Sequence, residues 1–425
     1  MAIALLAPIS AAQQIPIAFT GAQVIPIAGP AIPHGVVVVQ GGKITAIGPA
    51  SSVTIPPDAE RIDAAGKVIM PGLIDTHSHV GGGWAADGSA PIQPDVRVLD
   101  SINVRDSGFI RCRAGGLTTL NIMPGSGHLL SGQTIYAKLR KASTIDDFLM
   151  QDDKGRILGG MKMANGTNSQ REAPFPGTRS KSAALVRQKY VKAQEYRKKL
   201  QLAAADPEKM PDRDLELEGL VEVLEGRRVV HHHTHRADDI ITVLRLKQEF
   251  GFKVVLHHVS EAWKIPDEIA KAQVPCSVIV VDSPGGKIEA MNMNLATGAI
   301  LDKAGVMVGF HTDDWITDSR LFFRSAALAV RAGMSRDRAL YALTMAGAKM
   351  IELDTRIGSL EVGKDADLIV LSGDPLSVYT KVLQTYVEGV KVFDRTDPND
   401  LLFAVGGYGA GRDQIAHVCC GEDDR

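Results

Sequence analysis

The chain has 425 residues, a formal net charge of -2 and only 5% aromatic residues. A chain of this length is too long for a domain with one small core, and it suits a barrel of about 250 residues plus a second unit. The balanced charge and sparse aromatics exclude a basic or stacking surface for nucleic acid. Four cysteines without C-x-x-C spacing exclude a disulfide framework and a zinc finger: Cys112, Cys276, Cys419 and Cys420.

The first residues, MAIALLAPISAA, are apolar and end in small side chains, as a secretory signal does. The basic start of such a signal is missing, so residues 1–14 are expected to be a signal remnant or an apolar arm. A signal predicts a periplasmic or secreted protein, and an arm predicts a cytoplasmic one. No later apolar run reaches roughly 18 residues, so no membrane span is expected.

Residues 15–68 alternate short apolar and polar stretches with Gly-Gly and Pro-Pro pairs between them. Alternation of this kind with turn residues at the boundaries is typical of short strands. We therefore expect a small β-unit ahead of the main domain.

The stretch Val68–Val80, VIMPGLIDTHSHV, carries the clearest chemical signal. Its apolar residues predict a buried strand, and His77 and His79 follow two apart. Because residues two apart on an extended chain point to the same side, both imidazoles can reach one point in space. A bare pair of this kind also fits two hydrogen-bonded surface histidines. The nine residues PGLIDTHSH, however, resemble the first metal-binding motif of the amidohydrolase superfamily.

Strands and helices alternate through residues 69–357, at roughly 20–30 residues per unit, which predicts a parallel sheet. Expected strands lie at 116–122, 157–164, 228–235, 253–259, 276–281 and 306–311, and a long helix at 181–205. The expected fold is α/β, with an eight-stranded (β/α)8 TIM barrel. In such barrels the chemistry lies at the carboxyl ends of the strands, where this chain has its histidines.

Residues 358–394 contain GSLEVGKDADLIVL, which resembles a C-terminal signature of the same superfamily. The resemblance implies that this segment pairs with the N-terminal strands. The implied unit is a small β-sandwich domain built from residues 15–68 and 358–425.

A second histidine group, RRVVHHHTHRADDI, places His231, His233 and His235 on one strand face and His232 on the other. The segment HTHRADDI resembles the strand-five motif of imidazolonepropionase-like amidohydrolases, in which the first histidine of the pair is the metal ligand. That implies His233 as a ligand and His235 as a residue behind it or facing substrate. His231 and His235 remain alternative ligands.

Two further strand ends complete the pattern. The stretch KVVLHHVSEAW ends in His257 and His258, and strand alternation predicts that one faces inward and the other outward. The family pattern implies that His258 is the strand-six ligand. In VMVGFHTDDW, Asp313 matches the strand-eight aspartate of the superfamily, with Asp314 as the weaker candidate.

Imidazole nitrogens and a carboxylate suit Zn²⁺ and leave a position open for water. The resemblance implies one or two zinc ions held by His77, His79, His233 and Asp313. A bound metal lowers the pKa of its water from 15.7 to about 7, and Asp313 then serves as general base and acid. His258 is expected to bind a second metal or to stabilise the developing oxyanion.

Many binuclear members of the superfamily carry a carboxylated strand-four lysine that bridges two metals. Lys162, in GGMKMANGTN, is the candidate for that role, and a surface lysine is the alternative. The following loop reads Gly166, Thr167 and Asn168, where relatives often read G-E-N. If that glutamate is a ligand in relatives, its absence here favours a single metal.

His128, in GSGHLLSGQ, is a candidate substrate contact. Arg171 and Arg179 have the bidentate geometry that clamps a carboxylate, but solvated surface charges are the expectation for both.

The motifs predict a metal-dependent hydrolase of an amide or peptide-like C–N bond in a small molecule, such as a dipeptidase or N-acyl amino acid hydrolase. A homo-oligomer is expected. The alternative is an imidazolonepropionase-like cyclic-amide hydrolase or a hydrolytic deaminase. Deaminating members place a Glu shortly after the strand-five histidine, whereas this chain reads Thr234, His235 and Arg236. A scaffold without catalysis is a third class, and the intact ligand set argues against it.

Overall fold

The computed structural model describes residues 15–82, 87–280, 287–314 and 316–406, so the possible signal segment lies outside the described residues. The helices are α1 (Ser107–Ala114), α2 (Arg179–Ala203), α3 (Leu215–Leu224), α4 (Ala237–Phe250), α5 (Pro266–Ala272), α6 (Thr297–Lys303), α7 (Phe322–Arg331), α8 (Arg336–Ala342), α9 (Met345–Met350) and α10 (Pro398–Val405).

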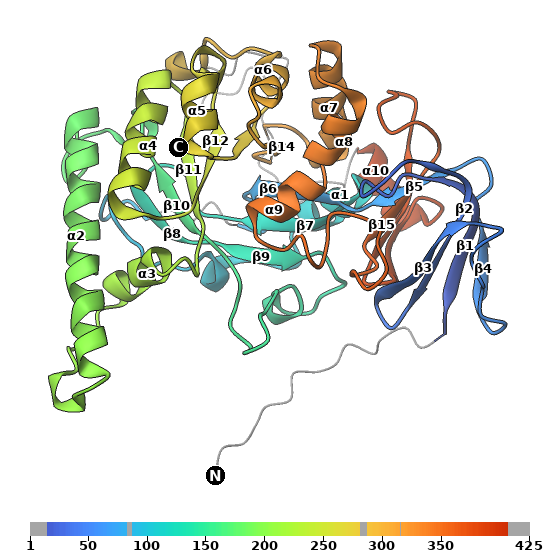
Figure 1. The fold of residues 1–425 in the computed structure, drawn as a ribbon, viewed down its shortest axis with the longest axis horizontal. Helices are drawn as coiled ribbons and strands as arrows, with labels where there is room; N and C mark the ends of the chain where they lie inside the picture. Colours follow the sequence, from blue (N-terminus) through green and yellow to red (C-terminus); the bar gives the residue numbers. More distant parts are fainter. Residues whose placement is uncertain (1–14, 83–86, 281–286, 315, 407–425) are drawn as a thin grey trace.

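The first and last strands of the chain share one eight-stranded sheet, seen at the right of Figure 1. Its members are β1 (Ile17–Val24), β2 (Ile32–Gln40), β3 (Lys43–Pro49), β4 (Glu60–Asp63), β5 (Val68–Pro71), β15 (Leu368–Leu371), β16 (Val382–Val387) and β17 (Val390–Asp394). The strands from residues 17–71 and those from residues 368–394 meet where β5 pairs antiparallel with β15. The expected pairing of the termini is therefore present. A sandwich of two stacked sheets is not confirmed, because hydrogen bonds join all eight strands into one sheet.

This sheet has its own apolar core, in which the rings of Phe19 and Tyr386 pack edge to face with centroids 5.0 Å apart. The alternating valines of β2 supply much of that core: Val37 and Val39 face it, while Val36 and Val38 face a smaller cluster on the other side. Strand alternation in the sequence thus determines which side chains are buried on each face.

The central strands form two sheets. The six-stranded sheet has the order β14-β13-β12-β11-β10-β8, and the three-stranded sheet has the order β6-β7-β9. These strands are β6 (Leu73–Ser78), β7 (Leu117–Ile122), β8 (Leu130–Gln133), β9 (Ile135–Lys138), β10 (Met161–Ala164), β11 (Val230–Thr234), β12 (Val254–His258), β13 (Cys276–Val278) and β14 (Val308–Phe310). From β10 to β14 every neighbouring pair is parallel, as the alternation of strands and helices predicts.

The expected closed barrel is not present as one hydrogen-bonded ring among the described residues. The segment 130–138 runs antiparallel to both of its neighbours and divides at Thr134, so that β8 pairs with β10 while β9 pairs with β7. Thr134 Oγ1 accepts a hydrogen bond from the Gly160 amide at that division (2.8 Å). At the opposite side, Ser78 and Asp314 form only an isolated bridge between the two sheets.

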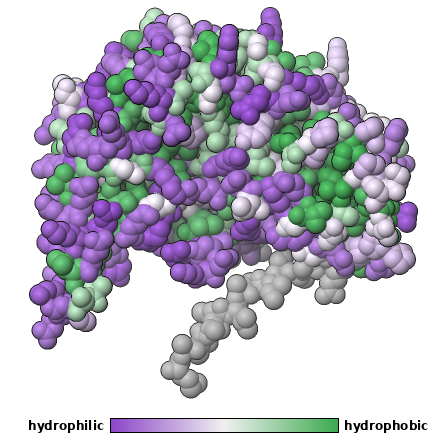
Figure 2. Space-filling view, viewed as in Figure 1, coloured by the Kyte–Doolittle hydropathy of each residue, from purple (hydrophilic) through white to green (hydrophobic). Residues whose placement is uncertain are grey.

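Helices cover the outside of the central strands, and α2 is the longest of those described (Figure 1). It begins after Thr178, whose side chain accepts a hydrogen bond from the Lys181 amide. Figure 2 shows hydrophilic residues along this edge of the molecule. None of the described helices combines the length and the apolar character needed to cross a membrane.

Candidate metal centre

The strand β6 is buried along its whole length and brings His77 and His79 to its carboxyl end. The Nε2 atoms of the two histidines lie 3.3 Å apart. Asp313, which follows β14, places Oδ1 3.1 Å from His79 Nε2 and 3.5 Å from His77 Nε2. Three donor atoms from two strand ends therefore converge on one point, as the sequence predicted for these residues.

A buried carboxylate fixes these two strand ends against each other. Asp75 accepts hydrogen bonds from the backbone amides of His77 (3.0 Å) and Thr312 (3.1 Å) and from the Thr312 hydroxyl (2.5 Å). Asp313 has φ 50, so the chain turns sharply there. Its amide donates to the His77 carbonyl at 3.0 Å, which holds the carboxylate at the site.

The end of β12 differs from the sequence expectation. Both His257 and His258 face the interior, with ring centroids 5.0 Å and 4.7 Å from the ring of His77. The expected alternation of one inward and one outward ring was wrong because His258 has φ 69 and Val259 has φ 50. These left-handed conformations end the strand and rotate the second side chain inward.

The two inward histidines have different partners. His257 Nε2 lies 3.0 Å from His231 Nδ1, and Tyr136 Oη lies 3.2 Å from His231 Nε2. His258 Nδ1 lies 3.9 Å from Asp313 Oδ2. The structure thus places His231 in a hydrogen-bonded set with Tyr136, and His258 beside the convergent donors.

Two neighbours of the site were missed by the sequence reasoning. His311 Nε2 lies 3.1 Å from His258 Nδ1, and its Nδ1 lies 2.8 Å from Ser277 Oγ. Its position two residues before Asp313 on the same strand end was a usable signal. Glu289 lies in a 3-10 turn (Ile288–Ala290), and its Oε1 is 4.0 Å from His233 Nε2. Nothing in the sequence around Glu289 pointed to the site.

Lys162 on β10 is fully buried, so the surface alternative was wrong. Its Nζ lies 3.0 Å from both His77 Nε2 and Met123 Sδ. Burial lowers the pKa of this amine to about 7. Lys162 therefore contacts His77 of the histidine pair, and among the described residues no carboxylate forms a hydrogen bond with its amine.

Burial also lowers the pKa of the site histidines, to about 3 for His235 and well below the usual range for His77, His233 and His258. Neutral imidazoles offer lone pairs to a metal. The Nε2 atoms of His233, His235 and His258 are buried and have no hydrogen-bond partner. Because unpaired buried polar atoms are costly, a donor set of this kind fits a divalent cation.

The remaining sequence candidates lie elsewhere. His128 Nε2 lies 2.5 Å from the Asp87 carbonyl, and its ring packs against Phe175. Arg171 stacks over Phe175 with its guanidinium carbon 3.7 Å from the ring centroid. Arg171 is exposed, as expected of a solvated surface charge. Arg179 is only part-exposed and pairs with the buried Asp239, so for Arg179 the expectation of a simply solvated charge was wrong.

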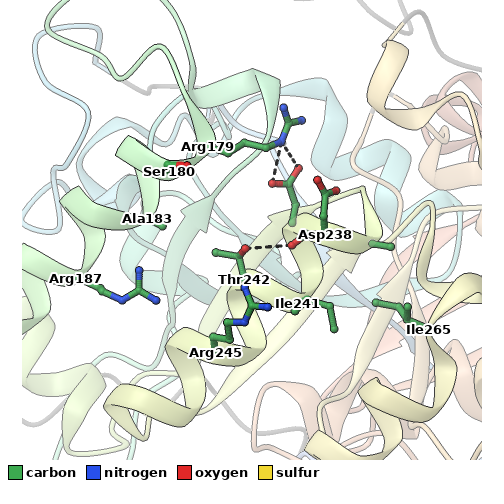
Figure 3. Close-up of a pocket in the computed structure, with 11 residues that line it drawn as sticks. Arg179, Ser180, Ala183, Arg187, Asp238, Ile241, Thr242, Arg245 and Ile265 are labelled. Carbon is green, nitrogen blue, oxygen red and sulfur yellow. Dashed lines mark hydrogen bonds and ion pairs between the residues drawn. The ribbon is translucent and has the colours of Figure 1, made fainter.

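Arg179 lines a cavity of about 630 Å³ between α2 and α4, shown in Figure 3. Its Nε donates to both carboxylate oxygens of Asp239, at 2.9 and 3.0 Å. Arg187 and Arg245 line the same cavity (Figure 3). Arg179 Nη2 also lies 3.8 Å from Glu289 Oε2, so this residue links the outer cavity to the histidine cluster.

Residues 176–392, slightly more than half of the chain, match the model of the amidohydrolase family. The structure resembles the crystal structure of an amidohydrolase from Thermotoga maritima with a TM-score of 0.82 and 34% identity, covering 89% of this chain and 100% of that one. Amidohydrolase tasK of Hapsidospora irregularis is 26% identical over 85% of this chain, which spans only 40% of that relative's length. Imidazolonepropionase of Fusobacterium nucleatum is 23% identical, over 81% of this chain and 87% of that enzyme.

The chain belongs to the amidohydrolase family. With its hydrolase-named relatives, this membership makes it a metal-dependent hydrolase acting on C–N bonds. The family uses divalent metals, and the described residues contain three groups of donors that fit one: His77 with His258 and His311, His77 with His79 and Asp313, and His233 with His235 and Glu289.

Proposed function

We propose that the protein hydrolyses an amide or peptide-like C–N bond of a small molecule, as a dipeptidase or an N-acyl amino acid hydrolase does. The observation that carries the proposal is the convergence of His77, His79 and Asp313 at two neighbouring strand ends. Two imidazoles and one carboxylate suit Zn²⁺, with a further position left for water.

Bound at these residues, a divalent metal supplies a Lewis acid and an acidic water. His79 Nδ1 is held by the Met123 carbonyl at 2.8 Å, which fixes the ring and directs Nε2 toward Asp313. Burial raises the pKa of Asp313, but its contacts with His79 together with the nearby His311 and Lys162 outweigh burial and bring that pKa to about 2. Asp313 is therefore ionised at neutral pH, and its free oxygen takes a proton from water and delivers it to the leaving nitrogen.

Two further roles belong to the same proposal. Lys162, buried and 3.0 Å from His77 Nε2, is a candidate for carboxylation, which would turn the amine into a bridging ligand. His258 is a candidate ligand of a second ion or the group that stabilises the oxyanion. Its ring centroid lies 4.7 Å from that of His77 and 4.4 Å from that of His233.

The proposed architecture is a (β/α)8 barrel over residues 69–357, of which the two central sheets are arcs, with a β-unit from 15–68 and 358–425. Support comes from the family match and from the shared sheet of the chain ends. We also propose a homo-oligomer and export to the periplasm or medium. Sedimentation velocity of the purified protein and fractionation of producing cells test these two proposals.

A second activity, hydrolysis of a cyclic amide as by imidazolonepropionase, or hydrolytic deamination, has similar support because several relatives carry the name imidazolonepropionase and others are named deaminases. A panel of dipeptides, N-acyl amino acids, cyclic amides and aminopurines separates the two. Turnover of the first two classes alone supports the main proposal, and turnover of the last two alone replaces it.

The test of the metal assignment is the double variant His77→Ala, His79→Ala. It should lose the ion held at this position and all hydrolysis, while a far-ultraviolet spectrum shows the fold retained. Zinc content equal to that of the unmodified protein would contradict the assignment.

A further inference from the structure

We propose that the cavity between α2 and α4 binds a small organic anion, that is, a molecule with a carboxylate or phosphate head and an apolar body. Its volume of about 630 Å³ lies within the range of small-molecule sites in proteins. The cavity lies on the helical outside of the central strands (Figure 3). None of the described residues that line it belongs to the three donor groups that fit a metal, so the proposal goes beyond the proposed function and does not depend on it.

Three arginine side chains line this cavity. Arg179 and Arg187 belong to α2, and Arg245 belongs to α4. Figure 3 shows Arg187 and Arg245 on the two helices that face each other across the cavity. In the described part of the chain, the guanidinium of Arg245 has neither an ion pair nor a hydrogen bond. Because the planar guanidinium group binds carboxylates and phosphates through paired N–H donors, an unpaired arginine in a cavity is suited to an anion.

The two carboxylates in the lining already have cationic partners. Asp239 is buried, and both of its oxygens accept from Arg179 Nε, at 2.9 and 3.0 Å. Asp238 accepts from Arg236 Nε and Nη2, each at 2.9 Å. These pairs neutralise the negative charge of the lining, which leaves the positive charge of Arg245 without compensation.

Arg187 forms only an exposed ion pair. Its Nε lies 2.6 Å from Glu249 Oε2, but the two side chains are 39% and 41% exposed, and ion pairs this exposed contribute little to stability. The other N–H donors of Arg187 can therefore bind an anion in the cavity. The first turns of α2 and α4 also line the cavity, and the positive ends of their dipoles favour negative charge there.

The rest of the lining suits an apolar body with a few polar contacts. Ala183 of α2, Ile241 of α4 and Ile265 contribute apolar surface, and Ser180 and Thr242 contribute hydroxyl groups. Apolar surface that is removed from water on binding adds to affinity, so an organic anion gains from both parts of the lining. An inorganic ion uses the arginines alone. The geometry thus favours an organic carboxylate or phosphate over a bare ion.

The experiment is calorimetric titration of the full chain, purified with its metal, with phenyl phosphate, benzoate and inorganic phosphate. At least one organic probe should bind more tightly than inorganic phosphate, and the tighter of the two identifies the head group. Arg245→Gln should weaken that binding by about tenfold or more, because it removes the uncompensated charge. Since Arg245 is exposed, the variant should keep its fold, which a far-ultraviolet spectrum checks.

Two further variants serve as a control and a converse. Arg331→Gln, on α7, removes an exposed arginine that also lacks an ion pair among the residues described, and it should bind the probes as the unmodified protein does. Glu249→Gln releases Arg187 from its pair and should tighten binding of the anion several-fold. A general effect of net charge would instead weaken binding equally in Arg245→Gln and Arg331→Gln, and that result would reject the site.

A localised measurement separates this cavity from the metal centre, where a bound metal can also take an anion in its open position. Phenylglyoxal modifies accessible arginine side chains, and peptide mass mapping reports each one. The bound probe should protect Arg245 and Arg187 and leave Arg331 unprotected. Three results would overturn the proposal: unchanged affinity in Arg245→Gln, inorganic phosphate binding as tightly as both organic probes, or protection at neither Arg245 nor Arg187. The assay needs no turnover, so failure of the proposed hydrolysis does not affect it.

Discussion

Two fully buried lysines, one in each of the two central sheets, have opposite electrostatic surroundings. Lys138 on β9 forms a short ion pair with Asp365 and lies 3.1 Å from Asp367 and 3.4 Å from Glu388. Burial lowers its pKa, but the three carboxylates outweigh burial and raise it. Lys162 on β10 has His77 and Met123 as its neighbours, and burial lowers its pKa to about 7.

The difference lies in charge compensation. Lys138 joins a central strand to the eight-stranded sheet through carboxylates that keep it charged, so it holds the architecture together. Lys162 has no carboxylate within hydrogen-bonding distance in the described chain, so its amine is readily neutral and available to react or to bind. In this protein a buried charge that is paired, as at Lys138, has a structural role. Buried polar atoms without partners, as beside Lys162, indicate a ligand-binding site.

The largest expected effect tests the site side of this contrast. Asp313→Asn keeps the size of the side chain and one oxygen donor but cannot accept a proton, so turnover should fall by about 10²–10⁴ with metal retained. Asp314→Asn should change turnover little, since Asp314 is paired with Ser319 Oγ at 3.4 Å. Both are assayed on one responsive amide with metal content measured alongside. A dead Asp314→Asn beside a nearly normal Asp313→Asn would transfer the proton role to Asp314.

The next effect tests the structural side. Lys138→Met removes the cation shared by the buried Asp365 and Asp367 and the part-exposed Glu388. The change should cost about 3–5 kcal/mol of unfolding free energy, the usual penalty for an uncompensated buried charge. Urea denaturation measures it. Folded protein should still hold its metal. A loss below about 1 kcal/mol would mean that Lys43 and Arg356, which also contact Asp365, suffice to compensate the charge.

A smaller effect is expected at acid pH. The cations around Asp365 outweigh its burial and lower its pKa to about 2, below the value of about 3.9 expected in the unfolded chain. A depressed carboxyl pKa stabilises the fold above the unfolded value, so this contribution should be lost as pH falls from about 4 toward 2. Thermal melts across this window measure it. The melting temperature should fall less steeply with falling pH in Lys138→Met than in the unmodified protein. An equal pH dependence in both proteins would exclude Asp365 as the source of the acid destabilisation.

The smallest effect on stability is expected for Lys162→Met. The change removes a poorly compensated buried amine, so the unfolding free energy should stay within about 1 kcal/mol or rise. Turnover should fall if the amine or its carboxylated form is a ligand. The same urea titration compares it directly with Lys138→Met. A loss as large as that of Lys138→Met would remove the contrast between the two lysines.

Much of the chain could be predicted from local pattern. The apolar runs at 116–122, 228–235 and 253–259 became β7, β11 and β12 with ends shifted by a few residues, and the helix expected at 181–205 is α2. The convergence of His77, His79 and Asp313 followed from strand alternation and motif order. Signals of this kind are local, so they are present in the sequence itself.

What was missed depends on geometry that local pattern does not encode. The antiparallel segment 130–138 contains Gly132 at φ 121 and changes sheets at Thr134, so no regular period marks it. The inward turn of His258 depends on a positive φ that histidine seldom adopts. Glu289 reaches the site through tertiary packing across more than 50 residues from His233, and its own neighbours in sequence carry no motif.

The pairing of β5 with β15 also sets an order of events during synthesis. Met70 pairs with Ile369, which is synthesised roughly 300 residues later. Strand pairings between residues so far apart in sequence form slowly. Until the final strands leave the ribosome, β5 is an apolar edge with open amides and carbonyls, which is a template for unwanted pairing. The protein is thus expected to rely on chaperones while it is being translated, and nascent chains stalled before residue 368 should be bound by them most strongly.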